Sequence, residues 1–464
     1  MNYPSSELVI DPVMVRRYDV SGPGYTSYPT ADRFVEAYGE AQLRHWVDKR
    51  RIGGIGQPLS VYVHLPFCDT VCLRCACDKV VTRGHGRSAK YIKYLIAELG
   101  LLDRLLGDDR GISQLHWGGG TPALPSRDET RALADRIKQV FQPERDCECS
   151  IEIDPRRLEA GTMAFLAELG FNRVSIGVQN FGLQVHKGVS RVQSEGLIRG
   201  AIEQARAAGF RSVNLDLIYG LPKQTLDSFN ASLDQVLALD PDRIALYSYA
   251  HLPRVLHRHR RIAEVELPAS ETRLQIQMLA IGRLTGAGYL YIGMDHFAKP
   301  GDELAVAQRR GGLHRSFQGY SARPDGDLLG LGVSAIGQVG PTYYQNRKRL
   351  GDYYAALDGG QLPVMRGVEL TQDDLVRRAV IRALMCNFRL SIESIELSYL
   401  IDFRDYFARE LQALARLAED GLVELQPEWI VVTPAGRLLV RVICTVFDRY
   451  AQDSRRLASC SRLM

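Results

Sequence analysis

Residues 61–77, "VYVHLPFCDTVCLRCAC", place four cysteines within ten positions, at Cys68, Cys72, Cys75 and Cys77. The run that precedes them, "LSVYVHL" (59–65), is rich in β-branched and aromatic residues and is typical of a strand. The cysteines therefore lie on a loop that directly follows a strand. Such a cluster can form a disulfide, a zinc site or an iron–sulfur site.

The cysteine spacing is Cys-x3-Cys-x2-Cys-x-Cys. A structural zinc site usually takes its four ligands as two separated pairs, and the sequence offers no second pair of cysteines or histidines at a suitable distance. Three thiolates on one tight loop can instead bind three irons of a [4Fe–4S] cluster, which leaves the fourth iron open to a small molecule. The spacing therefore argues against zinc and fits an iron–sulfur cluster.

The composition points to an ordinary cytoplasmic protein. The chain has 464 residues, a hydrophobic content of 45% and a formal net charge of +4, which does not indicate nucleic acid as a partner. Its length suffices for one large core and a smaller domain. The first residues lack the pattern of a signal peptide, and no window approaches the roughly 18 apolar residues of a membrane span. In a reducing compartment the nine cysteines do not form a disulfide framework.

Residues 59–250 alternate between strand-like and helix-like patterns. Strands are predicted at 59–65, 112–117, 149–154, 173–178, 212–218 and 243–249. Helices are predicted at 89–106 and near 127–140, 160–169, 195–209 and 225–239. This alternation predicts an α/β fold with a parallel sheet, either open or closed into part of a (β/α) barrel. In both cases the chemistry belongs at the carboxyl ends of the strands.

Unusual residues follow these predicted strand ends. The cysteines follow the first strand, and "GGGTP" (118–122) follows the second. Glu152, Gln179 and Asp216 lie late in, or directly after, later strands. Glycines allow close approach of a ligand to the backbone, and these polar side chains can bind a ribose or an ammonium group. Each residue alone fits an ordinary loop or helix cap, but their common position predicts one site.

The flanking regions complete the predicted domain organisation. Residues 1–54 form a turn-rich N-terminal extension, and the α/β domain is expected to span 55–345, ending in a helix, a strand at 289–294 and glycine-rich loops. A mainly helical domain at 365–464 is predicted to resemble a winged helix. Its helices are expected near 372–387, 394–402 and 406–420, before a hairpin. Because the chain is nearly neutral, we expect this domain to pack against or cover the site rather than bind DNA.

The cysteine loop resembles that of the radical S-adenosylmethionine (SAM) superfamily, in which CxxxCxxC follows the first strand of a partial (β/α)6 barrel. Beyond this loop, nearly the whole chain is similar to the oxygen-independent coproporphyrinogen III oxidase family. The motifs that carry the resemblance are "GPGYTSYPTA" (22–31), "YVHLPFC" (62–68), "QLHWGGGTP" (114–122), "SIEIDPR" (150–156), "GVQNF" (177–181), "NLDLIYGLPKQT" (214–225), "YAHLP" (249–253), "GMDHFAKPGDELAVAQRRG" (293–311), "FQGY" (317–320) and "CNFRL" (386–390). The additional Cys77 belongs to the same pattern.

The resemblance assigns roles position by position. It implies that Cys68, Cys72 and Cys75 bind the cluster, and that Cys77 does not. The residues implied to contact the first SAM are Tyr62, Gly119, Glu152, Gln179, Arg191, Asp216 and Ala250. Those that match contacts to a second SAM are Gly120, Thr121 and Ile336. Phe317 and Gln318 belong to a segment associated with the active site, and no side chain is assigned a catalytic role.

The resemblance also implies a reaction and its partners. Coproporphyrinogen III would lose two propionate carboxylates to give the vinyl groups of protoporphyrinogen IX, after a 5′-deoxyadenosyl radical removes hydrogen from the propionate β-carbon. The implied partners are the porphyrinogen substrate, a flavodoxin-like electron donor and an unidentified electron acceptor. We expect no binding to nucleic acid or to a membrane, and we expect the protein to be a monomer. The basic stretch "RVLHRHRR" (254–261) could contact substrate carboxylates, or simply be solvated.

Three residues depart from the family pattern. Arg74 replaces an aromatic before the third cysteine, Ala76 replaces a glycine after it, and Gly24 replaces an arginine. Arg74 would lie beside the cofactor, where its charge could pair with a carboxylate or raise the cluster potential. Two alternatives remain: a haem-binding chaperone-like protein of the same fold, and a radical SAM enzyme with another substrate. The N-terminal extension and Cys77 argue against the first, and "YTSYPTA" and "FQGY" argue against the second.

Overall fold

The computed structural model describes most of the chain as two compact units. The described residues are 8–9, 11–18, 22–50, 57–68, 72–73, 80–81, 86–121, 125–254, 256–323 and 326–451. Unit 1 comprises Met1–Asp32, Gln277–Asp325 and Leu370–Met464, and unit 2 comprises Arg33–Ile276 and Gly326–Glu369. Arg74, Cys75, Ala76 and Cys77 lie outside the described residues.

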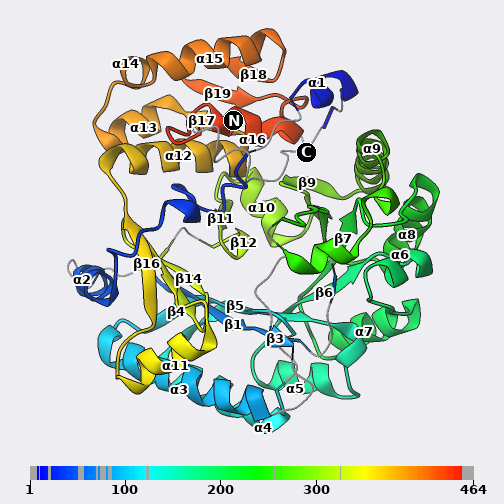
Figure 1. The fold of residues 1–464 in the computed structure, drawn as a ribbon. Coiled ribbons are helices and arrows are strands. Elements are labelled where there is room, and N and C mark those ends of the chain that lie inside the picture. The colour runs from blue at the N-terminus through cyan, green and yellow to red at the C-terminus, as the bar shows by residue number, and fades with distance from the viewer. Residues whose placement is uncertain are drawn as a thin grey trace. The chain divides into compact units, whose positions relative to one another are not determined.

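Unit 2 is built on six parallel strands that follow one another in sequence and in space (Figure 1). They are β1 (Leu59–Leu65), β4 (Gly111–Gly119), β5 (Gln142–Ile153), β6 (Arg173–Gln179), β7 (Ser212–Tyr219) and β8 (Arg243–Ser248). Their apolar side chains are buried, as expected for parallel strands covered by helices. All six predicted strands are confirmed, and with them the α/β partial-barrel fold.

Helices connect these strands. They are α3 (Gly86–Leu106), α4 (Arg127–Val140), α5 (Thr162–Glu168), α6 (Leu183–Gly188), α7 (Glu195–Ala207) and α8 (Leu226–Leu239). Five were predicted, and only the short α6 was not. Side-chain caps define the starts of two of them: Ser126 and Glu129 form a capping box on α4, and Thr225 and Ser228 form one on α8.

The sheet continues beyond β1 with strands that the sequence did not predict. β13 (Leu328–Leu331) runs parallel to β1, and three antiparallel strands follow it: β14 (Ile336–Val339), β15 (Thr342–Asn346) and β16 (Val364–Glu369). The expectation of glycine-rich loops here was wrong. A Cβ on Gly337 would lie 2.3 Å from the ring of Tyr344, and one on Gly330 would lie 2.5 Å from the carbonyl oxygen of Ile336. The glycines are therefore needed for close packing within strands, although by composition they indicate turns.

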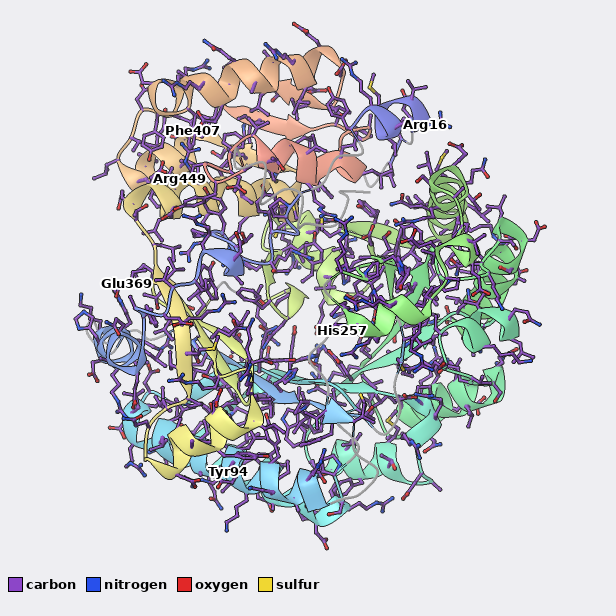
Figure 2. The ribbon with its side chains drawn as sticks, viewed as in Figure 1. Arg16, Tyr94, His257, Glu369, Phe407 and Arg449 are labelled. Atoms are coloured by element: carbon purple, nitrogen blue, oxygen red, sulfur yellow. The ribbon has the colours of Figure 1, made fainter. Side chains whose placement is uncertain are left out.

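Two further helices belong to unit 2, α2 (Glu40–Arg50) and α11 (Leu350–Asp358). Tyr94 of α3, labelled in Figure 2, donates a hydrogen bond to Asp358 at the end of α11 over 2.9 Å. Its ring stacks on that of Tyr354. Trp46 of α2 donates its indole N–H to Glu369 of β16 over 2.9 Å. Polar contacts at the surface thus fix both helices against this half of the sheet.

Unit 1 contains the mainly helical C-terminal region and confirms its winged-helix-like character. Its elements are α12 (Gln372–Asn387), β17 (Arg389–Ser391), α13 (Ile392–Tyr399), α14 (Phe403–Tyr406), α15 (Ala408–Glu419), β18 (Val423–Leu425), β19 (Trp429–Val432) and α16 (Val440–Thr445). Three of its strands form a sheet in the order β17-β19-β18. Unit 1 also contains α1 (Pro12–Arg17), β9 (Leu290–Gly293), β10 (His296–Ala298), α10 (Glu303–Arg309), β11 (His314–Ser316) and β12 (Gly319–Ser321). Helix α9 (Ser270–Gly286) begins in unit 2 and ends in unit 1.

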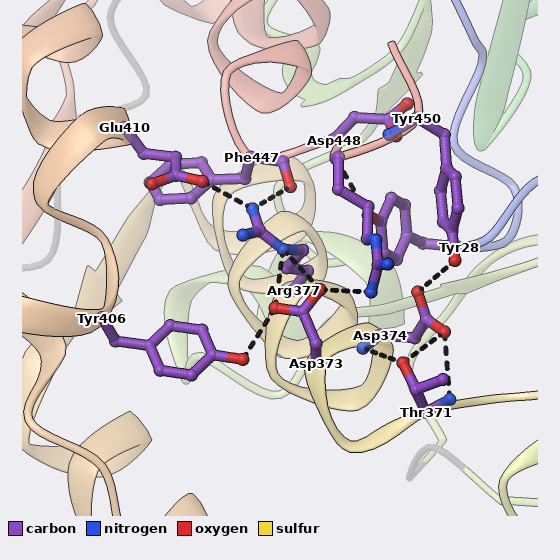
Figure 3. A network of polar contacts seen from close by, with 11 residues as sticks. Tyr28, Thr371, Asp373, Asp374, Arg377, Tyr406, Glu410, Phe447, Asp448 and Tyr450 are labelled. Atoms are coloured by element: carbon purple, nitrogen blue, oxygen red, sulfur yellow. Dashed lines mark hydrogen bonds and ion pairs between the residues drawn. The ribbon is translucent and has the colours of Figure 1, made fainter. Parts of the chain in front are cut away.

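A network of charged side chains ties the helices of unit 1 together (Figure 3). Arg377 of α12 donates hydrogen bonds to Asp373 over 2.9 Å, to Glu410 of α15 over 2.8 Å and to the backbone oxygen of Phe447 over 3.0 Å. Asp373 also accepts from Arg449 over 2.8 Å. Charge-assisted bonds shared between three segments orient α12, α15 and the chain after α16. None of the helices in the described ranges is long and apolar enough to cross a membrane.

A buried carboxyl group lies in the core of unit 2. Glu98 of α3 accepts hydrogen bonds from the N–H of Gly332 over 2.8 Å, the hydroxyl of Tyr353 over 2.6 Å and the amide of Asn346 over 2.8 Å. Burial raises the pKa of Glu98 to about 7, although these hydrogen bonds partly offset the effect. An unfolded chain has a glutamate pKa of about 4.3. The folded state therefore binds this proton more tightly than the unfolded state.

This difference predicts a specific pH dependence of stability. The contribution of Glu98 is complete below about pH 4 and is lost as the pH rises through about 7, so the free energy of unfolding should fall across that range. The variant Glu98→Gln should remove this part of the slope and lower stability by about 1–3 kcal/mol, because an amide cannot accept all three bonds. Urea denaturation at several pH values measures both effects. The exposed Glu159→Gln is the matched control, and an unchanged slope in Glu98→Gln would contradict the account.

Candidate functional site

The described part of the cysteine loop lies at the carboxyl end of β1. Cys68 ends the short strand β2 (Phe67–Cys68), which pairs with β3 (Val80–Val81), and Cys72 follows in the loop. Both thiols are buried. The hydroxyl of Thr121 lies 3.8 Å from the sulfur of Cys68, and a guanidinium nitrogen of Arg191 lies 4.0 Å from the sulfur of Cys72. The structure thus brings two predicted cluster ligands next to two predicted SAM contacts.

The glycine segment after β4 lies directly against the cysteine-bearing strand. The N–H of Gly120 donates to the oxygen of Leu65 over 2.7 Å, and the N–H of Thr121 donates to the oxygen of Phe67 over the same distance. A Cβ on Gly120 would lie 2.2 Å from that Phe67 oxygen. Gly119 has a φ of +114°, a conformation that side-chain-bearing residues rarely adopt. Only glycine fits these positions, so the glycine run sets how closely β4 approaches the cysteines.

Glu152 of β5 extends from the same edge and stays accessible. Its carboxylate accepts from the N–H of Gly119 over 3.1 Å and lies 3.2 Å from Nε2 of His116. The ring of His116 stacks on Tyr62 of β1, with centroids 5.7 Å apart, and the hydroxyl of Tyr62 lies 2.9 Å from Nδ1 of His64. The side chain of Glu152 is 41% exposed, so the carboxylate can accept further donors. Tyr62, Gly119 and Glu152 therefore form one contiguous surface.

Strands β6 and β7 add further polar side chains at the same carboxyl edge of the sheet. Ser175 of β6 lies opposite Glu152 in the register, and its hydroxyl donates to Asp216 of β7 over 3.0 Å. Asp216 also accepts from Asn214 over 2.8 Å. Gln179 ends β6, is buried and has a positive φ of 71°. Such a conformation in a non-glycine residue is uncommon and often occurs at functional sites.

Two further predicted residues, Ala250 and Ile336, lie at other strand ends of unit 2. Ala250 follows β8 and is half-buried, and Ile336 opens β14 and is also half-buried. No contact of either residue links it directly to the others among the described interactions. In the basic stretch after β8, Arg254, Arg260 and Arg261 are exposed. Phe317 and Gln318 belong to unit 1 and form the loop between β11 and β12.

A buried ion network surrounds Cys72, and sequence reasoning did not predict it. Arg191 lies 3.3 Å from a carboxylate oxygen of Asp154, and Arg156 lies 2.6 Å from the other oxygen. Burial alone would raise the pKa of Asp154, but the hydrogen bond from Arg156 and the charges of both arginines outweigh it and hold the pKa below its usual value. Arg156 also reaches the Cys72 thiol. The one local pattern that could have indicated this network is "IDPR" (153–156), in which Asp154 caps the turn Pro155–Arg157.

The residues at this edge fit an iron–sulfur cluster and a polar cofactor. Thiolates are the ligands of such clusters. Two buried thiols lie here, Cys68 beside the hydroxyl of Thr121 and Cys72 beside the guanidiniums of Arg191 and Arg156. Nε of Arg191 is buried and has no hydrogen-bond acceptor among the residues that the structure describes. The glycine backbone and the accessible Glu152 carboxylate supply groups that a SAM ammonium or ribose can contact.

Comparisons with known proteins agree with this geometry. The model of the Radical SAM superfamily matches residues 62–236, and that of the HemN C-terminal domain matches residues 370–439. Oxygen-independent coproporphyrinogen III oxidase from Pseudomonas aeruginosa is 48% identical over 96% of this chain and 97% of its own length. The enzyme from Escherichia coli K12 is 46% identical over 98% of each chain. The solved structure of Escherichia coli coproporphyrinogen III oxidase (HemN), described as a radical SAM enzyme, has a TM-score of 0.91 at 45% identity and covers 96% of this chain and 100% of its own.

The close approach at Gly120 predicts a strong effect of a single methyl group. Gly120→Ala places Cβ against a backbone carbonyl that cannot rotate away, so the variant should lose about 1–3 kcal/mol of stability. It should also bind less iron and sulfide after anaerobic reconstitution, as measured by chemical analysis. Gly200→Ala on α7 is the control, because no atom lies within 4 Å of its new Cβ. Equal iron contents in the two variants would show that the close approach of Gly120 to Phe67 is not needed for cluster binding.

The Asp154 network predicts a second contrast. Asp154→Asn leaves the guanidiniums of Arg156 and Arg191 buried without a counter-charge, which should cost about 3–5 kcal/mol in the free energy of unfolding. The control is Glu168→Gln, which breaks the exposed Arg131–Glu168 pair and should cost about 0–1 kcal/mol. Chemical denaturation at neutral pH measures both. A cost for Asp154→Asn no larger than the control would show that the network does not stabilise the fold.

Proposed function

Because this chain belongs to the oxygen-independent coproporphyrinogen III oxidase family, we propose that it converts coproporphyrinogen III to protoporphyrinogen IX in haem biosynthesis. The observation that carries the proposal is the similarity over nearly the full length of both chains, at 45–48% identity in three of the relatives compared. The matched residues include both the strands of the sheet and the C-terminal region of this chain. Identity of 46–48% over nearly the full length to proteins of that name favours the oxidase over a haem-binding protein of the same fold.

Family membership confirms the predicted enzyme class and cofactors. The chain is a radical SAM oxidoreductase, and the cofactors of that superfamily are a [4Fe–4S] cluster and SAM. When bound, they supply a radical that removes hydrogen from the substrate. Cofactors carry the difficult chemistry in such enzymes, and the protein supplies binding, orientation and exclusion of water. The contribution of this chain therefore lies in the residues at the carboxyl edge of the sheet.

The residue assignments are part of the proposal. Cys68, Cys72 and Cys75 would hold the cluster. Glu152 would accept a hydrogen bond from the SAM ammonium group, and Asp216 would accept one from a ribose hydroxyl, since both carboxylates lie at this edge. The other proposed contacts to the first SAM are Tyr62, Gly119, Gln179, Arg191 and Ala250, and those to a second SAM are Gly120, Thr121 and Ile336. Arg74 would lie beside the cofactor, where its guanidinium pairs with a carboxylate or raises the cluster potential.

The proposal extends to partners and location. The substrate is a porphyrinogen, a flavodoxin-like protein supplies the electron, and an acceptor of unknown identity takes the electron that remains after decarboxylation. We propose that the enzyme is a cytoplasmic monomer that does not bind nucleic acid or membranes. The division into an N-terminal extension (1–54), a catalytic domain (55–345) and a C-terminal domain (365–464) also belongs to this proposal.

An anaerobic activity assay tests the function. The chain is reconstituted with iron and sulfide and incubated with SAM, a reductant, coproporphyrinogen III and an added electron acceptor, and the products are separated by chromatography. We expect protoporphyrinogen IX and 5′-deoxyadenosine, and no product from Cys68→Ser. Arg74→Tyr in the same assay shows whether the arginine changes activity. Formation of 5′-deoxyadenosine without a vinyl product would reveal a different substrate, and no cluster assembly would exclude the radical mechanism.

A further inference from the structure

The hairpin β11–β12 of unit 1 presents an arginine on an aromatic support. Arg315 of β11 lies opposite Tyr320 of β12, and its guanidinium carbon lies 4.7 Å from the centre of the tyrosine ring. The hydroxyl of Tyr320 donates to the backbone oxygen of Met385 over 3.1 Å, and the ring of His296 packs edge-on against it. Because Tyr320 is fixed from both sides, the plane of the Arg315 guanidinium is fixed as well.

This guanidinium lacks the hydrogen-bond acceptors that a buried arginine normally has. Nε and Nη1 of Arg315 and Nε2 of Gln318 are all buried, and none has a partner within the described ranges of the chain. Two other arginines of unit 1 do have such acceptors: Arg441 donates to the backbone oxygen of Gly22 over 2.8 Å, and Arg377 has four acceptor oxygens. Buried polar groups in folded proteins are almost always hydrogen-bonded, so three unmatched donors on one hairpin call for an acceptor.

An acidic group that Arg315 influences, Asp295, does not fill that role. Asp295 lies in the turn between β9 and β10 and feels the charges of Arg441 and Arg315, but no hydrogen bond joins it to Arg315 among the described contacts. Burial raises the pKa of Asp295 to about 6, and the two arginines offset only part of the shift. Met294 and Asp295 both have positive φ angles, 43° and 67°. Positive φ at both residues of a two-residue loop is the usual geometry of a tight hairpin turn, so this conformation follows from the β9–β10 hairpin itself.

We propose that Arg315 and Gln318 bind a carboxylate, and that this carboxylate is a propionate of the porphyrinogen. The ligand assignment rests on the function proposed above. Hydrogen bonds from a guanidinium to a carboxylate are charge-assisted and strong, and Nε and Nη1 of Arg315 are buried donors without an acceptor in the described parts of the chain. The amide of Gln318, in the hairpin loop, adds a neutral donor. Coproporphyrinogen carries four propionates, and SAM carries one carboxylate, so the test has to separate these two sources.

Binding of coproporphyrin III, the stable oxidised form of the substrate, tests the proposal without turnover. The full-length reconstituted protein is titrated anaerobically while its tyrosine and tryptophan fluorescence is followed. Arg315→Met should weaken coproporphyrin binding at least tenfold, and Arg315→Lys should weaken it less, because a lysine keeps the charge but not the paired N–H groups. Arg310→Met is the control, since Arg310 is exposed in the same unit, and it should leave affinity unchanged.

Two further arms identify the ligand group. Coproporphyrin III tetramethyl ester has no free carboxylates, so Arg315→Met should not change its affinity. SAM affinity, measured by equilibrium dialysis, should also be unchanged in Arg315→Met. Equal losses for acid and ester, or no loss for the acid, would overturn the proposal, and a loss confined to SAM would assign the carboxylate to the cofactor instead. Arg315→Lys, checked by thermal denaturation, separates these outcomes from misfolding.

The test is independent of the activity assay. If Arg315-dependent coproporphyrin binding is found but no protoporphyrinogen forms, the carboxylate site stands and the proposed reaction fails. If protoporphyrinogen forms and Arg315→Met leaves the KM for coproporphyrinogen unchanged, the reaction stands and the carboxylate site is wrong.

Discussion

The contact between two backbones, at Gly120 and Phe67, decides the geometry of the site. A Cβ on Gly120 would lie 2.2 Å from the Phe67 carbonyl oxygen, so only glycine allows the end of β4 to reach the strand that carries Cys68. Through this approach, Thr121 contacts Cys68, and the N–H of Gly119 reaches Glu152 of β5. The cysteine loop, the glycine segment and the polar edge therefore form one arrangement because a single residue lacks a side chain.

Charged side chains add to the backbone geometry of the site. Arg191 and Arg156 lie between the Cys72 thiol and the buried carboxylate of Asp154, so the thiol faces positive charge while each guanidinium keeps a counter-charge. Positive charge beside a proposed cluster ligand is thus provided without leaving a buried charge unpaired. In unit 1, Nε and Nη1 of Arg315 are buried donors that have no acceptor in the described parts of the chain.

The sequence predicted the features that local patterns encode. The six parallel strands were predicted because each is a short run of buried β-branched or aromatic residues, and the helices because their apolar residues recur on one face. The strands from β13 to β15 were missed because Gly330 and Gly337 indicate turns, whereas in the structure they allow strands to pack closely. The ion pair of Asp154 with Arg191 joins residues that are distant in sequence. Whether the donors of Arg315 find an acceptor likewise depends on residues from other segments of the chain. No local pattern reports such relationships, because they arise only when the chain folds.

The central claim is that three cysteines hold a [4Fe–4S] cluster whose fourth iron is open to SAM. Mössbauer spectroscopy of the reconstituted protein, recorded with and without SAM, tests it most directly. The account predicts a cubane cluster in which one iron of four changes its isomer shift when SAM is added, while the other three do not. A cluster of another type, or a cubane whose spectrum does not respond to SAM, would contradict it.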